Sequence, residues 1–220
     1  MPMNDKYRRY IEAGQRIRKW IVDYVALIPA GSQFAIKTAA LTAVVNLLET
    51  LLGELEAAVG EGLSATDVKG SERLDLLELM EPTRDAARAA EGDVPGTRDR
   101  YRYTVNMSHQ AFLAAGRSFA LGGVDDEALL EGYGAPANWP ALITAASDAY
   151  EAAFGQQDSA KGSSVAKKAL IDENLDVFIA LKRSVTHMVP SFCSSDSGAI
   201  AAWHSAAHIE EAPKKNPPTP

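Results

Sequence analysis

Apolar residues recur at steps of three and four along nearly the whole chain, which is the spacing of one face of an α-helix. The first such stripe has these members: Tyr7, Ile11, Gly14, Ile17, Ile21, Tyr24 and Ile28. No window alternates apolar and polar side chains over the length that a half-buried strand requires. The sequence therefore predicts an all-α fold, an antiparallel helical bundle of about six to eight helices.

Capping residues, prolines and glycines set the expected ends of these helices. The first is expected from Asn4 to Pro29. The second opens at Ser32 and carries a wide apolar stripe to Val59, widened by Val45, Leu47 and Leu52, which is typical of a buried central helix. The others are expected over 64–92 with a kink or break near Glu81, over 101–119 ending at Gly122 and Gly123, over 125–132, from Asn138 to about 153, from Ser164 to Pro190, and from about Asp196 to Glu211.

Two stretches resemble each other in order, GSQFAIKTAALTAVVNLLETL from residue 31 and GSSVAKKALIDENLDVFIALKRSV from residue 162. Each begins Gly-Ser and runs as a long helix, and each is followed by a predicted Ser/Asp loop, at 64–67 and at 194–197. This order indicates a pseudo-two-fold duplication of residues 1–95 and 96–211 within one helical domain, 1–211, before a Pro-rich tail, 212–220. Two unrelated capped helices would also produce this likeness, and both interpretations stay open.

Charge and cysteine content limit the classes of partner and the cellular compartment that we expect for this protein. The chain has 22 basic and 29 acidic side chains, a formal net charge of -7, which argues against nucleic-acid binding. The basic first helix contains the i, i+4 pairs Asp5/Arg9, Glu12/Arg16 and Lys19/Asp23. These pairs predict a salt-bridged outer face, or a contact surface for the acidic part of a neighbouring subunit. The single cysteine, Cys193, excludes an internal disulfide and fits a reducing compartment.

The sequence also predicts a soluble, cytoplasmic protein with no membrane partner. The N-terminus is charged from Asn4 onward and lacks the apolar run of a secretory signal. The most apolar segment, 39–59, is interrupted by Thr42, Asn46, Glu49, Glu54 and Glu56, so we expect no membrane span there.

One candidate metal site lies in the last predicted helix. His204, His208 and Glu211 stand at i, i+4 and i+7, so that their side chains share one face and could hold a divalent metal with an open fourth position. The apolar face of the same helix, around Trp203, lies beside both histidines. The two histidines therefore also fit solvated flank positions without a metal.

Three short patterns resemble catalytic motifs but lack the necessary context. The string GRSFA at 116–120 resembles a nucleophile elbow but lacks the preceding strand that such an elbow needs. The string SVAK at 164–167 has the Ser-x-x-Lys spacing of penicillin-recognising enzymes but lacks their β-sheet, so helix capping explains Ser164. Cys193 lies near His187 in sequence, but an inert thiol is the default for an unactivated cysteine. The sequence predicts no catalytic residue and no cofactor other than the divalent metal considered above.

The ending AWHSAAHIE at 202–210, followed by APKK at 212–215, resembles the close of uncharacterised bacterial all-helical proteins. In these proteins a tandem helical repeat precedes a Trp-His helix and a basic, Pro-rich linker. The resemblance covers mainly the last thirty or so residues and, more loosely, the helices from Tyr101 onward. It implies a bacterial helical bundle with a repeat, and it transfers no activity.

These observations favour a non-catalytic structural or protein-interaction protein that associates with itself as a homo-oligomer, or with another protein. The alternative is a metal-binding module that uses the face of His204, His208 and Glu211. A third interpretation is a carrier of apolar ligands, with Trp139, Phe154 and Phe178 lining a cavity between helices.

Overall fold

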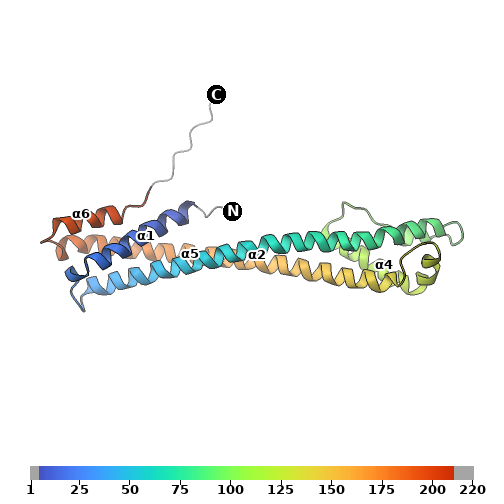
Figure 1. Ribbon diagram of the computed structural model, residues 1–220, viewed down its shortest axis with the longest axis horizontal. Helices are drawn as coiled ribbons and strands as arrows, with labels where there is room; N and C mark the ends of the chain where they lie inside the picture. The colour runs from blue at the N-terminus through green and yellow to red at the C-terminus, as the bar shows by residue number, and fades with distance from the viewer. Residues whose placement is uncertain (1–4, 211–220) are drawn as a thin grey trace, which may run out of the picture. The chain divides into compact units, whose positions relative to one another are not determined.

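The computed structural model describes residues 5–210, and its regular elements in that range are all helices (Figure 1). They are α1 (Asp5–Asp23), the 3-10 helix η1 (Val25–Leu27), α2 (Gln33–Ala90), α3 (Thr97–Arg100), α4 (His109–Gly132), α5 (Trp139–Phe192) and α6 (Ser197–Ala206). The predicted all-α class is confirmed, with six α-helices at the lower edge of the expected number.

The chain divides into two compact units, to both of which α2 and α5 contribute. Unit 1 comprises residues 1–58 and 163–220, and unit 2 comprises residues 59–162. Each unit thus combines segments from both predicted repeats, 1–95 and 96–211. The duplication and the single domain over 1–211 stay predictions, and the tail at 212–220 lies outside the described residues.

Aromatic contacts and one close approach hold unit 1 together. Trp20 of α1 packs edge-on against Trp203 of α6, with ring centroids 4.9 Å apart, and its indole N–H donates to the carbonyl of Ala199 at 2.9 Å. A Cβ on Gly14 would lie 2.8 Å from Val45, so the missing side chain lets α1 lie close to α2. Tyr7, Gly14 and Ile17 of the predicted apolar stripe are buried, and its other members are half-buried.

The second helix differs from its prediction because it does not stop at 64–67 or break at Pro82. The helix α2 runs through both positions. Within the expected loop, Thr66 donates its hydroxyl to the carbonyl of Gly62 at 2.8 Å and so stays inside helical geometry. Met80 and Thr83, on either side of the proline, are fully buried, and this packing offsets the one backbone hydrogen bond that proline removes.

The helix α5 is also continuous, from Trp139 through Ser164 and Pro190 to Phe192. The predicted helix start at Ser164 and the predicted stop at Pro190 are therefore wrong. Beyond it, α6 begins as expected, because the carboxylate of Asp196 accepts the N–H of Ala199 at 2.9 Å. Its last residue is Ala206, so it ends before Glu211.

The helix α4 differs from its prediction at both ends. Ser108 caps its start by accepting the N–H of Ala111 at 3.3 Å, so residues 101–107 precede the helix. The helix then runs through Gly122 and Gly123, which were expected to end it. A Cβ on Gly123 would lie 2.6 Å from both Trp139 and Pro140, so this glycine permits close packing within the helix.

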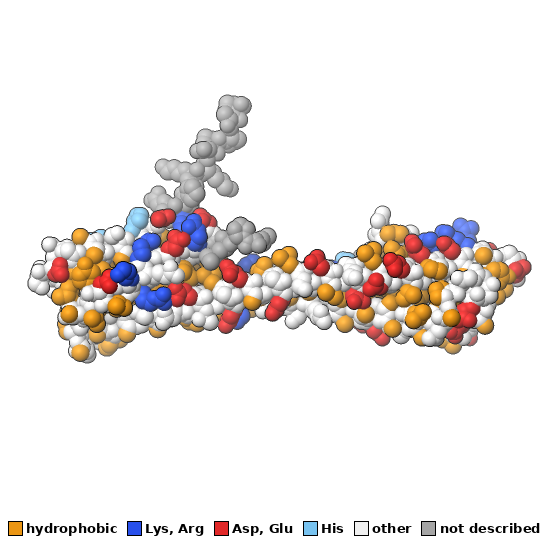
Figure 2. Space-filling view, in the orientation of Figure 1, with side chains coloured by type: hydrophobic (Ala, Val, Ile, Leu, Met, Phe, Trp, Pro, Cys, Tyr) orange, Lys and Arg blue, Asp and Glu red, His pale blue; other side chains and the backbone are white. Residues whose placement is uncertain are grey.

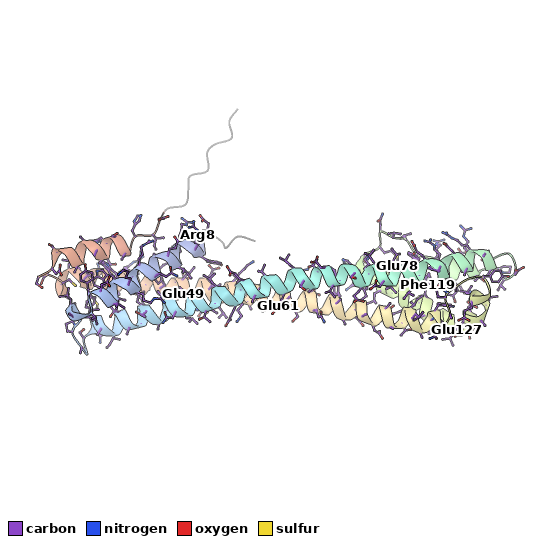
Figure 3. All side chains as sticks on the ribbon, in the orientation of Figure 1. Arg8, Glu49, Glu61, Glu78, Phe119 and Glu127 are labelled. Atoms are coloured by element: carbon purple, nitrogen blue, oxygen red, sulfur yellow. The ribbon has the colours of Figure 1, made fainter. Side chains whose placement is uncertain are left out.

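An aromatic cluster forms the core of unit 2. Tyr101, from the segment before α4, packs edge-on against Phe119 at 5.2 Å and against Trp139 at 5.5 Å. Phe119 is 1% exposed and lies among the helices of this unit (Figure 3). The non-helical segment therefore supplies core side chains that a regular helix over 101–119 would have placed elsewhere.

One helix among the described residues, α2, is long and apolar enough by length and composition to cross a membrane. Of the 18-residue stretch of α2 that meets this criterion, 33% is buried inside the protein. Core helices of soluble proteins meet the same test. The polar residues within segment 39–59 thus do not exclude α2 as a membrane-spanning helix by length and composition. The absence of a membrane partner stays a prediction.

We expect Gly123→Ala to lower the free energy of unfolding by about 1–3 kcal/mol, because the added methyl would overlap the buried Trp139 and Pro140. The control is Gly155→Ala in α5, where nothing lies within 4 Å of the new Cβ, and it should raise stability by about 0.5–1 kcal/mol. Urea unfolding followed by circular dichroism measures both. Equal changes in the two variants would contradict this packing.

Candidate interaction surfaces

Two of the three predicted metal ligands, His204 and His208, lie on either side of the end of α6. His204 is exposed on α6, while His208 lies two residues beyond the end of that helix, and its carbonyl accepts from Arg16 at 2.6 Å. Glu211 falls outside residues 5–210. Within those residues no group of three or more His, Cys, Asp or Glu side chains could hold a metal ion. The His204, His208 and Glu211 ligand set stays a prediction.

The residues of the motif-like strings belong to different elements of the fold. Ser118 is exposed on α4, and Ser164 lies inside α5. Cys193 is fully buried, and this burial, with a smaller contribution from Asp196, raises the pKa of its thiol. A raised thiol pKa favours the protonated, unreactive form.

The three aromatic residues of the predicted ligand carrier belong to different units. Trp139 and Phe154 are in unit 2, and Phe178 is in unit 1. Trp139 and Phe178 are each fully buried in the core. Phe154 contributes to a pocket in unit 2, described below.

A buried carboxylate ties the segment before α4 to that helix. Asp126 is 6% exposed and pairs with Arg100 at 2.7 Å, while it accepts the hydroxyl of Tyr101 at 2.8 Å. Burial, and then the bond to Asp126, raises the pKa of Tyr101. Because Arg100 and Tyr101 both use the same carboxylate, the cluster fixes Tyr101 in the core.

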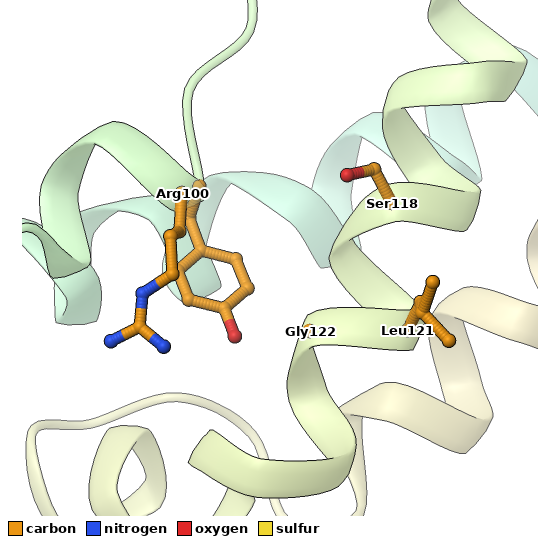
Figure 4. A pocket seen from close by; sticks show the side chains of 5 residues that line it. Arg100, Ser118, Leu121 and Gly122 are labelled. Carbon is orange, nitrogen blue, oxygen red and sulfur yellow. The ribbon is translucent and has the colours of Figure 1, made fainter.

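A shallow pocket of about 320 Å³ lies beside this cluster, lined by Arg100, Tyr101, Ser118, Leu121 and Gly122. Figure 4 shows the side chain of Arg100 on one side and Gly122 on the other. A Cβ on Gly122 would lie 3.0 Å from the hydroxyl oxygen of Tyr101. The pocket thus lies where Gly122 packs against Tyr101. The guanidinium of Arg100 that faces it is already paired with Asp126.

We expect Asp126→Ala to lower the free energy of unfolding by about 1–3 kcal/mol, because the buried hydroxyl of Tyr101 would lose its acceptor. The matched control, Asp125→Ala, removes an exposed neighbouring carboxylate and should change stability by less than about 0.5 kcal/mol. Chemical unfolding of both variants measures the difference. Similar losses in the two would show that the buried carboxylate has no special role.

A second polar cluster joins three helices of unit 2 through His109. Its Nδ1 is hydrogen-bonded to the hydroxyl of Tyr150, and its Nε2 lies 3.4 Å from the ammonium of Lys69. Lys69 also donates to the side chain of Gln157 at 2.7 Å. A lysine ammonium can only donate, so the geometry favours a neutral imidazole that accepts at Nε2 and donates at Nδ1.

The electrostatics of His109 agree with this assignment. Burial, and then the charges of Lys69, Arg73 and Lys161, lower its pKa. The adjacent pocket of about 210 Å³ is lined by His109, Gln110, Leu113, Tyr150, Glu151 and Phe154. Its polar groups connect helices to one another, and the cluster can act as a pH-sensitive link between α2, α4 and α5.

We expect the stability of the protein to fall as the pH drops below 6.5, the ordinary pKa of histidine. Because the folded state lowers the pKa of His109, the unfolded chain binds this proton more readily, so the stabilisation is complete above pH 6.5 and is lost below it. Thermal unfolding between pH 5 and 8 should show a smaller decline in Tm for His109→Gln than for the unaltered protein. The control is His187→Gln, at an exposed position of α5. An unchanged decline in His109→Gln would contradict the assignment.

Charged side chains on α1 face α2 and α5 within unit 1. Arg18 pairs with Glu49 of α2 at 2.8 Å, and Lys6 pairs with Asp172 of α5 at 2.8 Å. The predicted pair Lys19–Asp23 is present at 2.8 Å. Figure 2 shows acidic and basic side chains intermingled over this helix. The predicted pair Asp5/Arg9 is also present, at 3.7 Å, whereas Glu12 pairs with Arg8 and Arg16 donates to the carbonyl of His208. The salt-bridged face is therefore confirmed for two of its three predicted pairs, and the pair Glu12/Arg16 is wrong.

The sides of α2 and α5 that point away from α1 are apolar and exposed. Leu47 and Leu170 each lie two residues before a partner of α1, Glu49 and Asp172, which places them about 200° away around their helices. We call the following four residues the outer face of unit 1: Ile36 and Leu47 of α2, 53% and 44% exposed, and Leu170 and Val177 of α5, 42% and 43% exposed.

Two contacts bring the halves of this face together. Phe34 of α2 stacks on Phe192 of α5 at 4.8 Å, and Lys167 of α5 pairs with Glu54 of α2. These contacts set an antiparallel register in which Leu47 and Val177 lie at similar heights. Between residues 38 and 48, α2 has no charged side chain at all. The outer face is thus an apolar surface with little charge along its α2 side.

Helical periodicity alone had assigned Leu47 to the buried stripe of the second helix, together with its neighbours. That stripe is wider than the protein covers, because α1 and α6 pack on one side only. An excessively wide apolar arc was the sequence signal for an exposed apolar face.

No protein-family model matches this chain, and no curated protein or solved structure is significantly similar to it.

Proposed function

We propose that this protein is a non-catalytic structural or interaction protein that self-associates through the outer face of unit 1. The observation that supports this proposal is the exposure of four large aliphatic side chains on the side of α2 and α5 away from α1. Burying such side chains against a partner is favourable by about 25 cal/mol per Å² of apolar surface. A second copy offers the same apolar surface and can cover it symmetrically.

The size of the face indicates a reversible interaction. From Ile36 to the level of Leu170, α2 covers about 15 residues, or roughly 23 Å, and two neighbouring helices are about 20 Å wide. Two copies would together bury roughly 900 Å², which is at the small end of specific interfaces. The association should therefore depend on concentration.

The charge pattern supports a protein partner in the cytoplasm. The net charge of -7 would repel nucleic acid, and the basic residues of α1 are largely paired with carboxylates of the same chain. The free thiol of Cys193 is compatible with a reducing compartment. This proposal needs no metal and no cofactor.

Light scattering coupled to gel filtration tests the proposal. We expect the unaltered protein to show a mass above 23.6 kDa that rises with concentration, and Leu47→Glu combined with Val177→Glu to weaken the association at least tenfold. Two buried carboxylates in an apolar interface cannot be tolerated without partners.

The matched control is Val68→Glu combined with Leu74→Glu, at positions of α2 in unit 2 that are 41% and 58% exposed. It should associate like the unaltered protein, and circular dichroism should show the same helix content in all three proteins. Equal masses in both double variants would contradict the proposal. The unaltered protein is also tested for binding to neutral lipid vesicles. Binding that only the Leu47→Glu with Val177→Glu variant loses would show that the outer face contacts a membrane and not a second copy.

A further inference from the structure

The outer side of α4 carries the two most exposed large apolar side chains reported for the described residues. Leu121 is 77% exposed and Val124 is 76% exposed, whereas Phe119 and Gly123 of the same helix face the core. A shallow groove of about 320 Å³ runs beside them, lined by Arg117, Ala120, Leu121, Val124, Thr144 and Asp148. The helix α4 is therefore apolar on two opposite sides, and one of them has no cover within unit 2.

The exposed side has the spacing of a helix-pairing seam. Ala114, Arg117, Leu121, Val124 and Ala128 follow one another at steps of three and four, and all five are exposed. Such steps keep side chains on one line that faces a neighbouring helix. Alanines at the two ends allow two backbones to approach closely.

The seam is symmetric about Leu121 in a way that fits a second copy of itself. Four residues before Leu121 is Arg117, and four residues after it is Asp125. In an antiparallel pair centred on Leu121, Arg117 of each copy therefore meets Asp125 of the other. Ala114 likewise meets Ala128, seven residues on either side. Charge and size are both complementary between two identical helices.

We propose that α4 packs antiparallel against α4 of a second copy of this chain, with the two-fold axis at Leu121. Arg117 already contacts Glu151 and Asp148 of α5, which hold its guanidinium at the edge of the groove. No salt bridge holds Asp125 within residues 5–210, so its carboxylate is available to the second copy. Each pair of helices thus gains two ion pairs that flank a leucine contact.

This inference shares with the proposed function only the identity of the partner, since its surface lies in unit 2 and the outer face lies in unit 1. A chain with two different self-complementary faces links copies into an open series. Leu121→Glu should therefore limit the protein to pairs formed by the outer face. Leu47→Glu with Val177→Glu should limit it to pairs formed by α4.

Cysteine crosslinking tests the seam even if the pairing is short-lived. In Leu121→Cys, the two new thiols lie across the symmetry axis, and the native Cys193 is fully buried. Under mild oxidation we expect disulfide-linked dimers to form at least tenfold faster than in Leu74→Cys, an exposed position on α2 of the same unit, 58% exposed. Non-reducing gel electrophoresis measures the initial rates, and equal rates would overturn the proposal.

Charge exchange tests the register of the pairing. In the Leu121→Cys background, Arg117→Asp places two acidic pairs across the seam, and Asp125→Arg places two basic pairs there. Each variant alone should crosslink at least fivefold more slowly, and an equal mixture should regain the rate, because opposite charges then meet at both positions. Failure of the mixture to recover would exclude this register.

The same crosslinking in the Leu47→Glu and Val177→Glu background separates the two proposals. Rapid crosslinking there, together with a mass that this double substitution does not change, would support α4 pairing and contradict the outer face. Slow crosslinking of Leu121→Cys in this background, together with a mass of the otherwise unaltered protein that falls on Leu47→Glu with Val177→Glu substitution, would overturn the α4 pairing alone.

Discussion

Covering the apolar sides of α2 and α5 is the constraint from which most of this structure follows. Each long helix carries apolar residues once per turn, and these must be removed from water by other elements. In unit 1, α1 and α6 do this through Trp20 and Trp203. In unit 2, α4 and the segment before it do so through Phe119 and Tyr101. The covering elements pack on selected sides, and the outer face of unit 1 remains exposed.

Close approach matters as much as burial. Gly14 and Gly123 lie where another helix comes within about one atomic diameter of the missing Cβ. Asp126 provides the polar counterpart, because it accepts the buried hydroxyl of Tyr101 and neutralises Arg100. In unit 2, Gly123 and Asp126 fix α4 tightly enough to present Leu121 and Val124 on its outer side. The proposed seam thus depends on the core beneath it.

The helical class and several helix starts could be predicted because they depend on local rules. The caps at Ser32 and Asp196 and the salt bridges of α1 are examples. The helix interruptions could not be predicted, since tertiary packing carries α2 through Pro82 and α5 through Pro190. Gly122 and Gly123 were misread for a similar reason: a glycine at a close helix contact and a glycine at a helix end look alike in sequence.

The candidate surfaces were predictable only in kind. Self-association was expected from the absence of a converging set of catalytic residues, but Leu47 had been assigned to the core, because periodicity cannot reveal which part of a wide apolar arc remains uncovered. Arg117 and Asp125 lie four residues on either side of Leu121 in the sequence. This symmetry indicates a pairing surface only once α4 is known to expose Leu121.

Sedimentation equilibrium of the unaltered protein over a thousandfold range of concentration tests the central claim most directly. An interaction protein with uncovered apolar faces should show an average mass that rises steadily above the 23.6 kDa of one chain. A mass that stays at 23.6 kDa up to the highest concentration would contradict the account.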